Sequence, residues 1–144
     1  MDVGVPVTPN AESRPSGGQR GSSPQILVVD DEPDLRRITA RILLEEGYSV
    51  HEAGDGLEAL DYISSGKASF DAIVTDIVMP RLDGVGLLRR LALIQPDLPV
   101  VLMSGYGTDQ LAERGIASPC AVLSKPFPPE RLVAEVRRCI GERK

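Results

Sequence analysis

The chain has 144 residues, of which 42% are hydrophobic, and its formal net charge is -5. This length suits one domain with an ordinary core. The acidic balance argues against a nucleic-acid partner, which would need clustered Lys and Arg. No apolar run approaches the roughly 18 residues that span a bilayer, and no secretory signal pattern opens the chain. We therefore expect a cytoplasmic protein that binds neither nucleic acid nor membrane.

Residues 1–23 differ in composition from the rest of the chain, because they are rich in Gly, Ser and Pro and show no apolar periodicity. Such a segment buries too little apolar surface to offset the entropy of ordering it. We predict a disordered tail or linker at 1–23, followed by one folded domain at 24–144.

Strand-like and helix-like segments alternate from residue 25 onward. In chain order we expect a strand at 25–29, a helix at 33–47, a strand at 48–53, a helix at 55–65, a strand at 70–75, a helix at 84–95, a strand at 98–103, a short helix at 108–114, a strand at 120–124 and a helix at 129–140. Pro33 fits the first turn of its helix, and Asp55 fits an N-cap. Leu35, Ile38 and Ile42 mark an apolar face at helical spacing.

This alternation predicts an α/β fold, with a five-stranded parallel sheet, right-handed crossovers and helices on both faces. The most apolar strands should be central, and the more polar strand at 48–53 suits an edge. The expected strand order is 2-1-3-4-5, which is the flavodoxin-like, doubly wound arrangement.

Polar side chains follow four of the predicted strands, at the point where each strand ends. They are Asp30 and Asp31, Asp76, Ser104, and Lys125. The carboxyl ends of parallel strands meet at one edge of the sheet, where such folds bind ligands. The sequence therefore predicts three carboxylates, one hydroxyl and one ammonium in a single site.

Three neighbouring carboxylates repel one another unless a cation joins them. Hard oxygen ligands with open positions suit Mg²⁺, and the backbone carbonyl of Val78 is a further candidate ligand. The simpler interpretation is that Asp30 and Asp31 only cap the following helix. That interpretation leaves Asp76 unexplained, so we favour a metal site formed by Asp30, Asp31 and Asp76.

Asp76 is the candidate nucleophile, because a carboxylate can accept a phosphoryl group and form an acyl phosphate. Catalysis of such a transfer consists mainly of positioning and of neutralising charge on the equatorial oxygens. We expect Mg²⁺ to hold one oxygen, the Lys125 ammonium a second and the Ser104 hydroxyl a third.

The chain resembles the receiver domain of two-component response regulators, over residues 24–141. The matching segments are ILVVDDEP at 26–33, DAIVTDIVMP at 71–80 with DG at 83–84, MSGY at 103–106 and KPF at 125–127. The stretch at 98–106 looks most like receivers attached to hybrid sensor kinases.

The resemblance implies that a histidine kinase or a histidine phosphotransfer protein phosphorylates Asp76 with Mg²⁺, and that a downstream protein reads the change. It implies that Asp31 is the main acidic metal ligand, assisted by Asp30. It places Ser104 at the switch hydroxyl and Lys125 at the family's lysine. Such a domain catalyses only its own phosphorylation and dephosphorylation, and we expect a monomer or a weak dimer.

One position departs from the family pattern. An aromatic residue usually stands three positions before the lysine and moves inward with the hydroxyl, but here the residue is Val122. A valine is small and stiff at χ1, so it does not replace that ring. We offer the hypothesis that Tyr106 covers the site or supplies the mobile ring.

Two cysteines, Cys120 and Cys139, form neither a CxxC pair nor a zinc-finger set. Disulfides are rare in a reducing cytoplasm, so we predict two free thiols. Three functional alternatives stay open: a protein-binding module that works without phosphorylation, a phosphate sink in a phosphorelay, and a phosphatase with an aspartyl nucleophile. Val78 argues against the phosphatase, which would need an acidic residue there as general acid.

Overall fold

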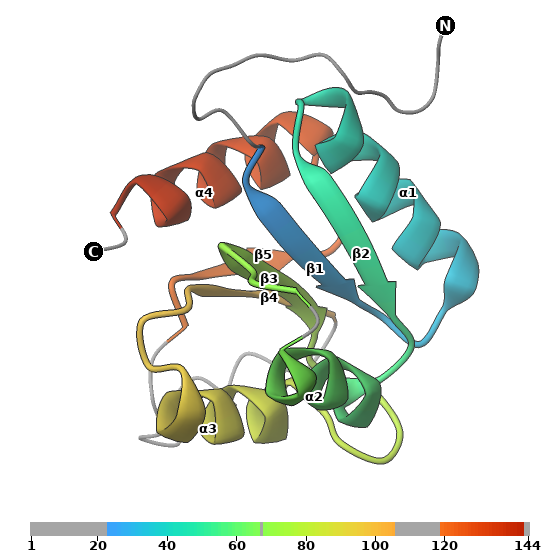
Figure 1. The fold of residues 1–144 in the computed structure, drawn as a ribbon. Coiled ribbons are helices and arrows are strands. Elements are labelled where there is room, and N and C mark those ends of the chain that lie inside the picture. The colour runs from blue at the N-terminus through green and yellow to red at the C-terminus, as the bar shows by residue number, and fades with distance from the viewer. Residues whose placement is uncertain (1–22, 67, 106–118, 143–144) are drawn as a thin grey trace, which may run out of the picture.

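The computed structural model describes residues 23–66, 68–105 and 119–142, which form a five-stranded parallel sheet with helices on both faces (Figure 1). The strand order is β2-β1-β3-β4-β5, so the predicted order is confirmed. The elements are β1 (Gln25–Val29), α1 (Pro33–Glu45), β2 (Ser49–Ala53), α2 (Gly56–Ser65), β3 (Ala72–Asp76), α3 (Gly84–Ile94), β4 (Val100–Ser104), β5 (Ala121–Ser124) and α4 (Pro129–Gly141).

The three central strands are the most apolar and the most deeply buried. Their side chains contribute to two core clusters, one on each face of the sheet. Helices α2 and α3 cover one face, whereas α1 and α4 cover the other (Figure 1). The edge strands β2 and β5 are only partly buried, as expected for the ends of such a sheet.

The predicted helix starts are confirmed by their caps. Pro33 begins α1, where its missing N–H costs no hydrogen bond. The Asp55 side chain accepts a hydrogen bond from the backbone N–H of Glu58 and so caps α2. Asp83 caps α3 in the same way, through the N–H of Gly86. The third and fourth strands begin two residues later than predicted, and β4 includes Ser104.

The predicted apolar face of α1 packs against the core only at Ile42, which is partly buried against the core cluster on that side of the sheet. Leu35 is 40% exposed and Ile38 is 56% exposed, whereas the buried residues of this helix are Thr39, Ala40 and Leu43. The helix therefore carries exposed apolar side chains at Leu35 and Ile38, beside the strip that packs on the sheet. Exposed apolar side chains of this kind do not stabilise the fold and are typical of a surface that binds a partner.

The prediction of two free thiols is wrong. Cys120 and Cys139 form a disulfide that joins the start of β5 to the last turns of α4. Neither the absence of a CxxC or zinc-finger motif nor the rarity of disulfides in a reducing cytoplasm reports that the fold brings a residue before β5 next to the buried face of α4. Cys139 is 1% exposed and belongs to the core cluster on that side of the sheet.

Three predictions concern residues outside the described part of the chain: the N-terminal tail, the short helix at 108–114 and the role of Tyr106. Among the residues that the structure does describe, no helix has the length and the apolar character needed to cross a membrane.

Candidate functional site

Three carboxylates lie together at the carboxyl edge of the sheet, as the sequence predicts. Strand β1 ends one residue before Asp30, β3 ends at Asp76, and the two strands are paired. One oxygen from each of Asp30, Asp31 and Asp76 lies within 4.8 Å of the others. Asp30 is buried, Asp76 is partly buried and Asp31 is exposed, so the cluster opens to water on the Asp31 side.

Lys125 directly follows the carboxyl end of β5 and points into this cluster. Its Nζ lies 3.3 Å from Asp76 Oδ1 and 3.8 Å from Asp30 Oδ2. Its backbone N–H donates to the carbonyl of Ser104 at 2.8 Å, which continues the pairing of β5 with β4 past the last strand residue. The pairing of the parallel strands therefore fixes the backbone position of Lys125, and its long side chain carries the ammonium across to the carboxylates.

Ser104 is the last residue of β4 and is buried. The preceding residue, Met103, is the register partner of Asp76, and its carbonyl accepts from Ile77 N–H at 3.2 Å. The Ser104 hydroxyl donates to the carbonyl of Gly105 at 3.3 Å. The serine thus stands at the strand end next to the carboxylate, on the Lys125 side of the sheet.

Asp76 is held in an environment that disfavours its charge. Burial raises the pKa of its carboxyl above the usual range, and the neighbouring Asp30 raises it further. The Lys125 ammonium and the N–H of Ile77, which donates to Oδ1 at 3.1 Å, act in the opposite direction. A divalent cation would supply the missing positive charge, and a set of carboxylate oxygens is the ligand set that Mg²⁺ or another hard cation prefers.

The predicted backbone ligand, Val78, lies in the loop between β3 and α3, two residues past Asp76. Val78 is 64% exposed, and its two neighbours Ile77 and Met79 are buried. The buried neighbours anchor the loop on both sides of Val78. Gly84 closes the base of the loop, since its N–H donates to Ile77 carbonyl at 2.8 Å.

Sequence reasoning missed Arg36, which stabilises the Asp30 end of the site. Its Nη1 donates to the backbone carbonyl of Asp30 at 2.8 Å, and its Nε donates to Glu52 Oε1 at 2.9 Å. The side chain is 17% exposed. The available signal was its position, because Arg36 precedes Ala40 by one helical turn and so shares the sheet-facing side of α1.

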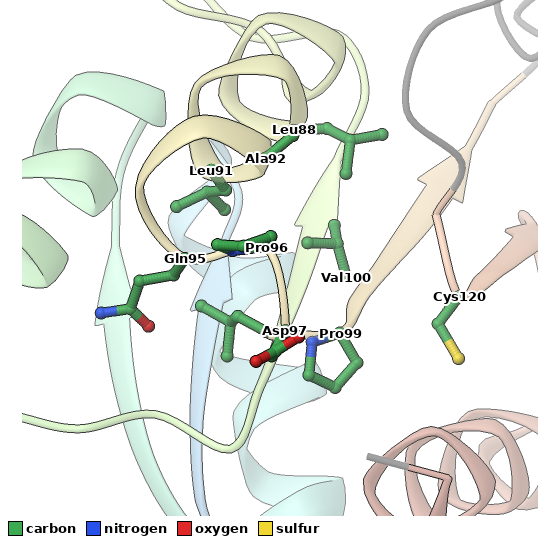
Figure 2. Close-up of a pocket in the computed structure, with 10 residues that line it drawn as sticks. Leu88, Leu91, Ala92, Gln95, Pro96, Asp97, Pro99, Val100 and Cys120 are labelled. Carbon is green, nitrogen blue, oxygen red and sulfur yellow. The ribbon is translucent and has the colours of Figure 1, made fainter. Parts of the chain in front are cut away.

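A cavity of about 180 Å³ lies outside this site (Figure 2). Its lining comes from the end of α3, the segment that leads into β4, and Cys120 ahead of β5. These residues lie where the strands begin, at the edge opposite the carboxylates. The polar groups that the sequence singled out all lie at the other edge.

Comparisons with known proteins agree with this geometry. The family model for the response regulator receiver domain matches residues 26–137. The chain is 42% identical over 125 residues to the response regulator MprA of Mycobacterium bovis, covering 85% of this chain and 53% of that protein. It is 34% identical over 137 residues to the sensor kinase CckA of Brucella abortus, covering 94% of this chain and 14% of that protein. The chain therefore spans about half or less of these relatives.

Solved structures share the fold over most of the chain. A response regulator receiver protein from Sinorhizobium medicae aligns with a TM-score of 0.77 and 30% identity, covering 85% of this chain and 98% of that one. The receiver domain of NtrX from Brucella abortus aligns with a TM-score of 0.72 and 36% identity, covering 81% and 98%.

Proposed function

The chain belongs to the family of response regulator receiver domains, and on this premise we propose that it is a phospho-accepting signalling switch. A histidine kinase or a histidine phosphotransfer protein is the phosphodonor, Asp76 is the acceptor, and a partner protein responds to the phosphorylated state. A kinase donor depends on ATP, so we place this reaction in the cytoplasm, although the Cys120–Cys139 disulfide is unusual in a reducing compartment. The main support is the contact of Lys125 Nζ with Asp76 Oδ1, at 3.3 Å, beside two further carboxylates.

The chemistry needs few groups. An oxygen of the Asp76 carboxylate attacks phosphorus, the bond from phosphorus to the donor's histidine nitrogen breaks, and an acyl phosphate forms. Lys125 is placed to neutralise charge on the transferred group, and Ser104 to bind another of its oxygens. Mg²⁺, held by Asp30, Asp31 and Asp76, would supply the remaining positive charge. Beyond this transfer and its hydrolysis we propose no enzyme activity.

The exposed apolar face of α1 supports a protein donor. Leu35, Ile38 and Ile42 line a groove of about 490 Å³ whose other wall includes Phe127. Asp30 and Lys125 also line this groove, so it runs directly into the phosphoacceptor site. A helix of a histidine-containing donor that packs on these side chains would bring its phosphohistidine over Asp76. This accounts for Leu35 and Ile38, which stay exposed on α1.

The test is phosphorylation by a small-molecule phosphodonor with Mg²⁺, read on a phosphate-affinity gel. We expect a shifted band in the wild type that depends on Mg²⁺ and is lost in Asp76→Ala. The matched control is Asp61→Ala, an exposed aspartate on α2, which should still give the band. A band that persists in Asp76→Ala contradicts the assigned acceptor. No band in folded wild type with Mg²⁺ bound, followed by no transfer from a phosphorylated histidine donor, favours a module that acts without phosphate.

A further inference from the structure

The loop between β3 and α3 contains an unusual backbone conformation. Among the residues described, Arg81 is the one residue other than glycine with a positive φ, at 68°. A side chain with a Cβ is disfavoured in this left-handed region, whereas glycine adopts it freely. Such outliers persist where the surrounding structure holds them, so the arginine side chain itself calls for an explanation.

That side chain binds the start of α2. Arg81 Nε donates to Asp55 Oδ2 at 2.9 Å, and its Nη2 contacts the same oxygen. The Asp55 carboxylate is 12% exposed, so the contact is shielded from water on the aspartate side. The other oxygen, Oδ1, accepts the capping bond from Glu58 N–H. One buried carboxylate thus caps α2 and anchors the loop.

The backbones of the loop and of α2 also touch. Gly56 N–H donates to the carbonyl of Leu82 at 3.1 Å, and a Cβ on Gly56 would lie 2.3 Å from that oxygen. At the base of the same loop, a Cβ on Gly84 would lie 2.4 Å from the carbonyl of Asp76. The loop is therefore fixed at its base against the phosphoacceptor and at its tip against α2, with Val78 between.

We propose that Arg81 is a positioning residue, whose ion pair with Asp55 holds the β3–α3 loop in the path that presents the backbone after Asp76 to the cation. The proposal deepens the function proposed above and rests on it. No contact of Arg81 with the cation or the phosphoryl group is involved. Its effect passes through the loop that begins at Asp76.

Two variants separate positioning from simple electrostatics. Arg81→Ala removes a positive charge, which on its own would strengthen binding of a cation; Asp55→Asn removes a negative charge, which on its own would weaken it. Asparagine also keeps an oxygen that can cap α2. If the ion pair positions the loop, each variant binds Mg²⁺ more weakly than the wild type. The double variant then binds Mg²⁺ no more weakly than either single variant.

Two further variants divide the role of the backbone from that of the side chain. Glycine accepts the positive φ without steric cost, so Arg81→Gly removes the ion pair but not the conformation. Arg81→Lys keeps a cation that can reach Asp55. We expect Arg81→Gly to bind Mg²⁺ more weakly than the wild type and Arg81→Lys to recover most of the affinity. Arg90→Ala, at an exposed arginine of α3, is the control for net charge.

The measurements are the Mg²⁺ dissociation constant by isothermal titration calorimetry and amide hydrogen exchange without Mg²⁺. We expect the dissociation constant to rise about tenfold in Arg81→Ala and Asp55→Asn. Exchange should be faster at the amides of Gly56 and Gly84, which bond across the loop, and unchanged in β1 and β4. Opposite shifts of the dissociation constant in the two variants, or unchanged exchange, would overturn the proposal.

The same experiment distinguishes this proposal from the proposed function. If the wild type binds no Mg²⁺, the metal site is wrong, and the exchange data alone decide whether Arg81 and Asp55 hold the loop. If the wild type binds Mg²⁺ and both variants match it in affinity and in exchange, the site stands and the positioning role of Arg81 is rejected.

Discussion

At the carboxyl edge of the sheet three carboxylates lie together and one ammonium contacts two of them, whereas at the amino edge a disulfide and a paired arginine join the last helix to the last strand. Arg138 donates to the carbonyl of Cys120 at 3.0 Å and also bonds Glu135 and Glu142. Burial and Asp30 raise the pKa of Asp76 at the first edge. The two edges thus differ in purpose: one holds like charges in an unfavourable arrangement, and the other closes the fold.

This difference is expected where a fold supports a reactive site. Groups that must bind a cation and accept a phosphoryl group are poorly compensated until those ligands arrive, and the protein is less stable for it. The opposite edge is free to be built from interactions that only stabilise. The comparison predicts that changes at the amino edge lower stability without altering chemistry, whereas changes at the carboxyl edge alter chemistry and, where they remove one of the like charges, raise stability.

The largest expected effect is loss of the disulfide. The two cysteines are 19 positions apart, and opening a loop of this length costs about 3 kcal/mol of unfolding free energy. We expect this loss for wild type in reductant and for the double variant Cys120→Ala with Cys139→Ala, measured by urea unfolding. Under native conditions the phosphorylation rate should stay within about twofold of the wild type, because the disulfide lies at the far edge. A rate that falls with the stability would mean that the edges are coupled.

Lys125→Gln should slow phosphorylation with little loss of stability. Removing a positioned charge of this kind typically slows a reaction about 100-fold, which corresponds to roughly 2.7 kcal/mol in the barrier. The assay is the rate of phosphorylation by a small-molecule donor at saturating Mg²⁺. Arg131→Gln, an exposed cation in the first turns of α4, is the control and should leave the rate unchanged. A Lys125→Gln rate within a few-fold of wild type would contradict the role given to the ammonium.

The site was more predictable from sequence than its supporting contacts. Asp30, Asp76 and Lys125 each directly follow or end an apolar run, so strand order alone brings them together. Arg81 was missed because nothing local marks it, and Arg36 because its helical spacing from Ala40 does not identify its partners. Their partners, Asp30 carbonyl and Asp55, come from other elements, and those contacts exist only once the helices have packed.

The fold shows the same limit. Periodicity located the helices that the structure describes, α1 to α4, and Asp55 and Pro33 marked two of their starts. Periodicity did not say which apolar face of α1 packs, because Leu35 and Ile38 repeat at helical spacing as core residues do. Thr39, Ala40 and Leu43 are the buried residues of this helix, whereas Leu35 and Ile38 stay exposed. The disulfide was missed for a related reason, because spacing motifs do not report tertiary neighbours.

The groove on α1 belongs to the carboxyl edge, and Ile38→Ser tests its role. We expect transfer from a phosphorylated histidine protein to slow about tenfold, roughly 1.4 kcal/mol, because an apolar anchor is lost. Phosphorylation by a small-molecule donor should not change. Ile94→Ser is the matched control, since Ile94 is 50% exposed on α3 and Ile38 is 56% exposed on α1. Equal effects of the two substitutions on transfer from the protein donor would contradict the role of the groove in binding that donor.

The smallest effect we predict is a gain in stability. Asp76→Asn removes a carboxylate whose ionised form is disfavoured by burial and by Asp30, so the free energy of unfolding should rise by about 1 kcal/mol at pH 7 without Mg²⁺. Asp61→Asn, at an exposed site, should change it little. Urea unfolding of the three proteins over a range of pH is the measurement.

The pH dependence gives this prediction its sign. Because the folded-state pKa of Asp76 is raised, the ionised carboxylate destabilises the wild type above that pKa, and protonation relieves the penalty as the pH falls through it. The advantage of Asp76→Asn should therefore be full at neutral pH and disappear in acid. Mg²⁺ should narrow the same gap at neutral pH by stabilising the wild type more than the variant. A variant less stable than wild type at pH 7 would mean that the attraction to Lys125 exceeds the cost of burial, and the contrast between the two edges would fail.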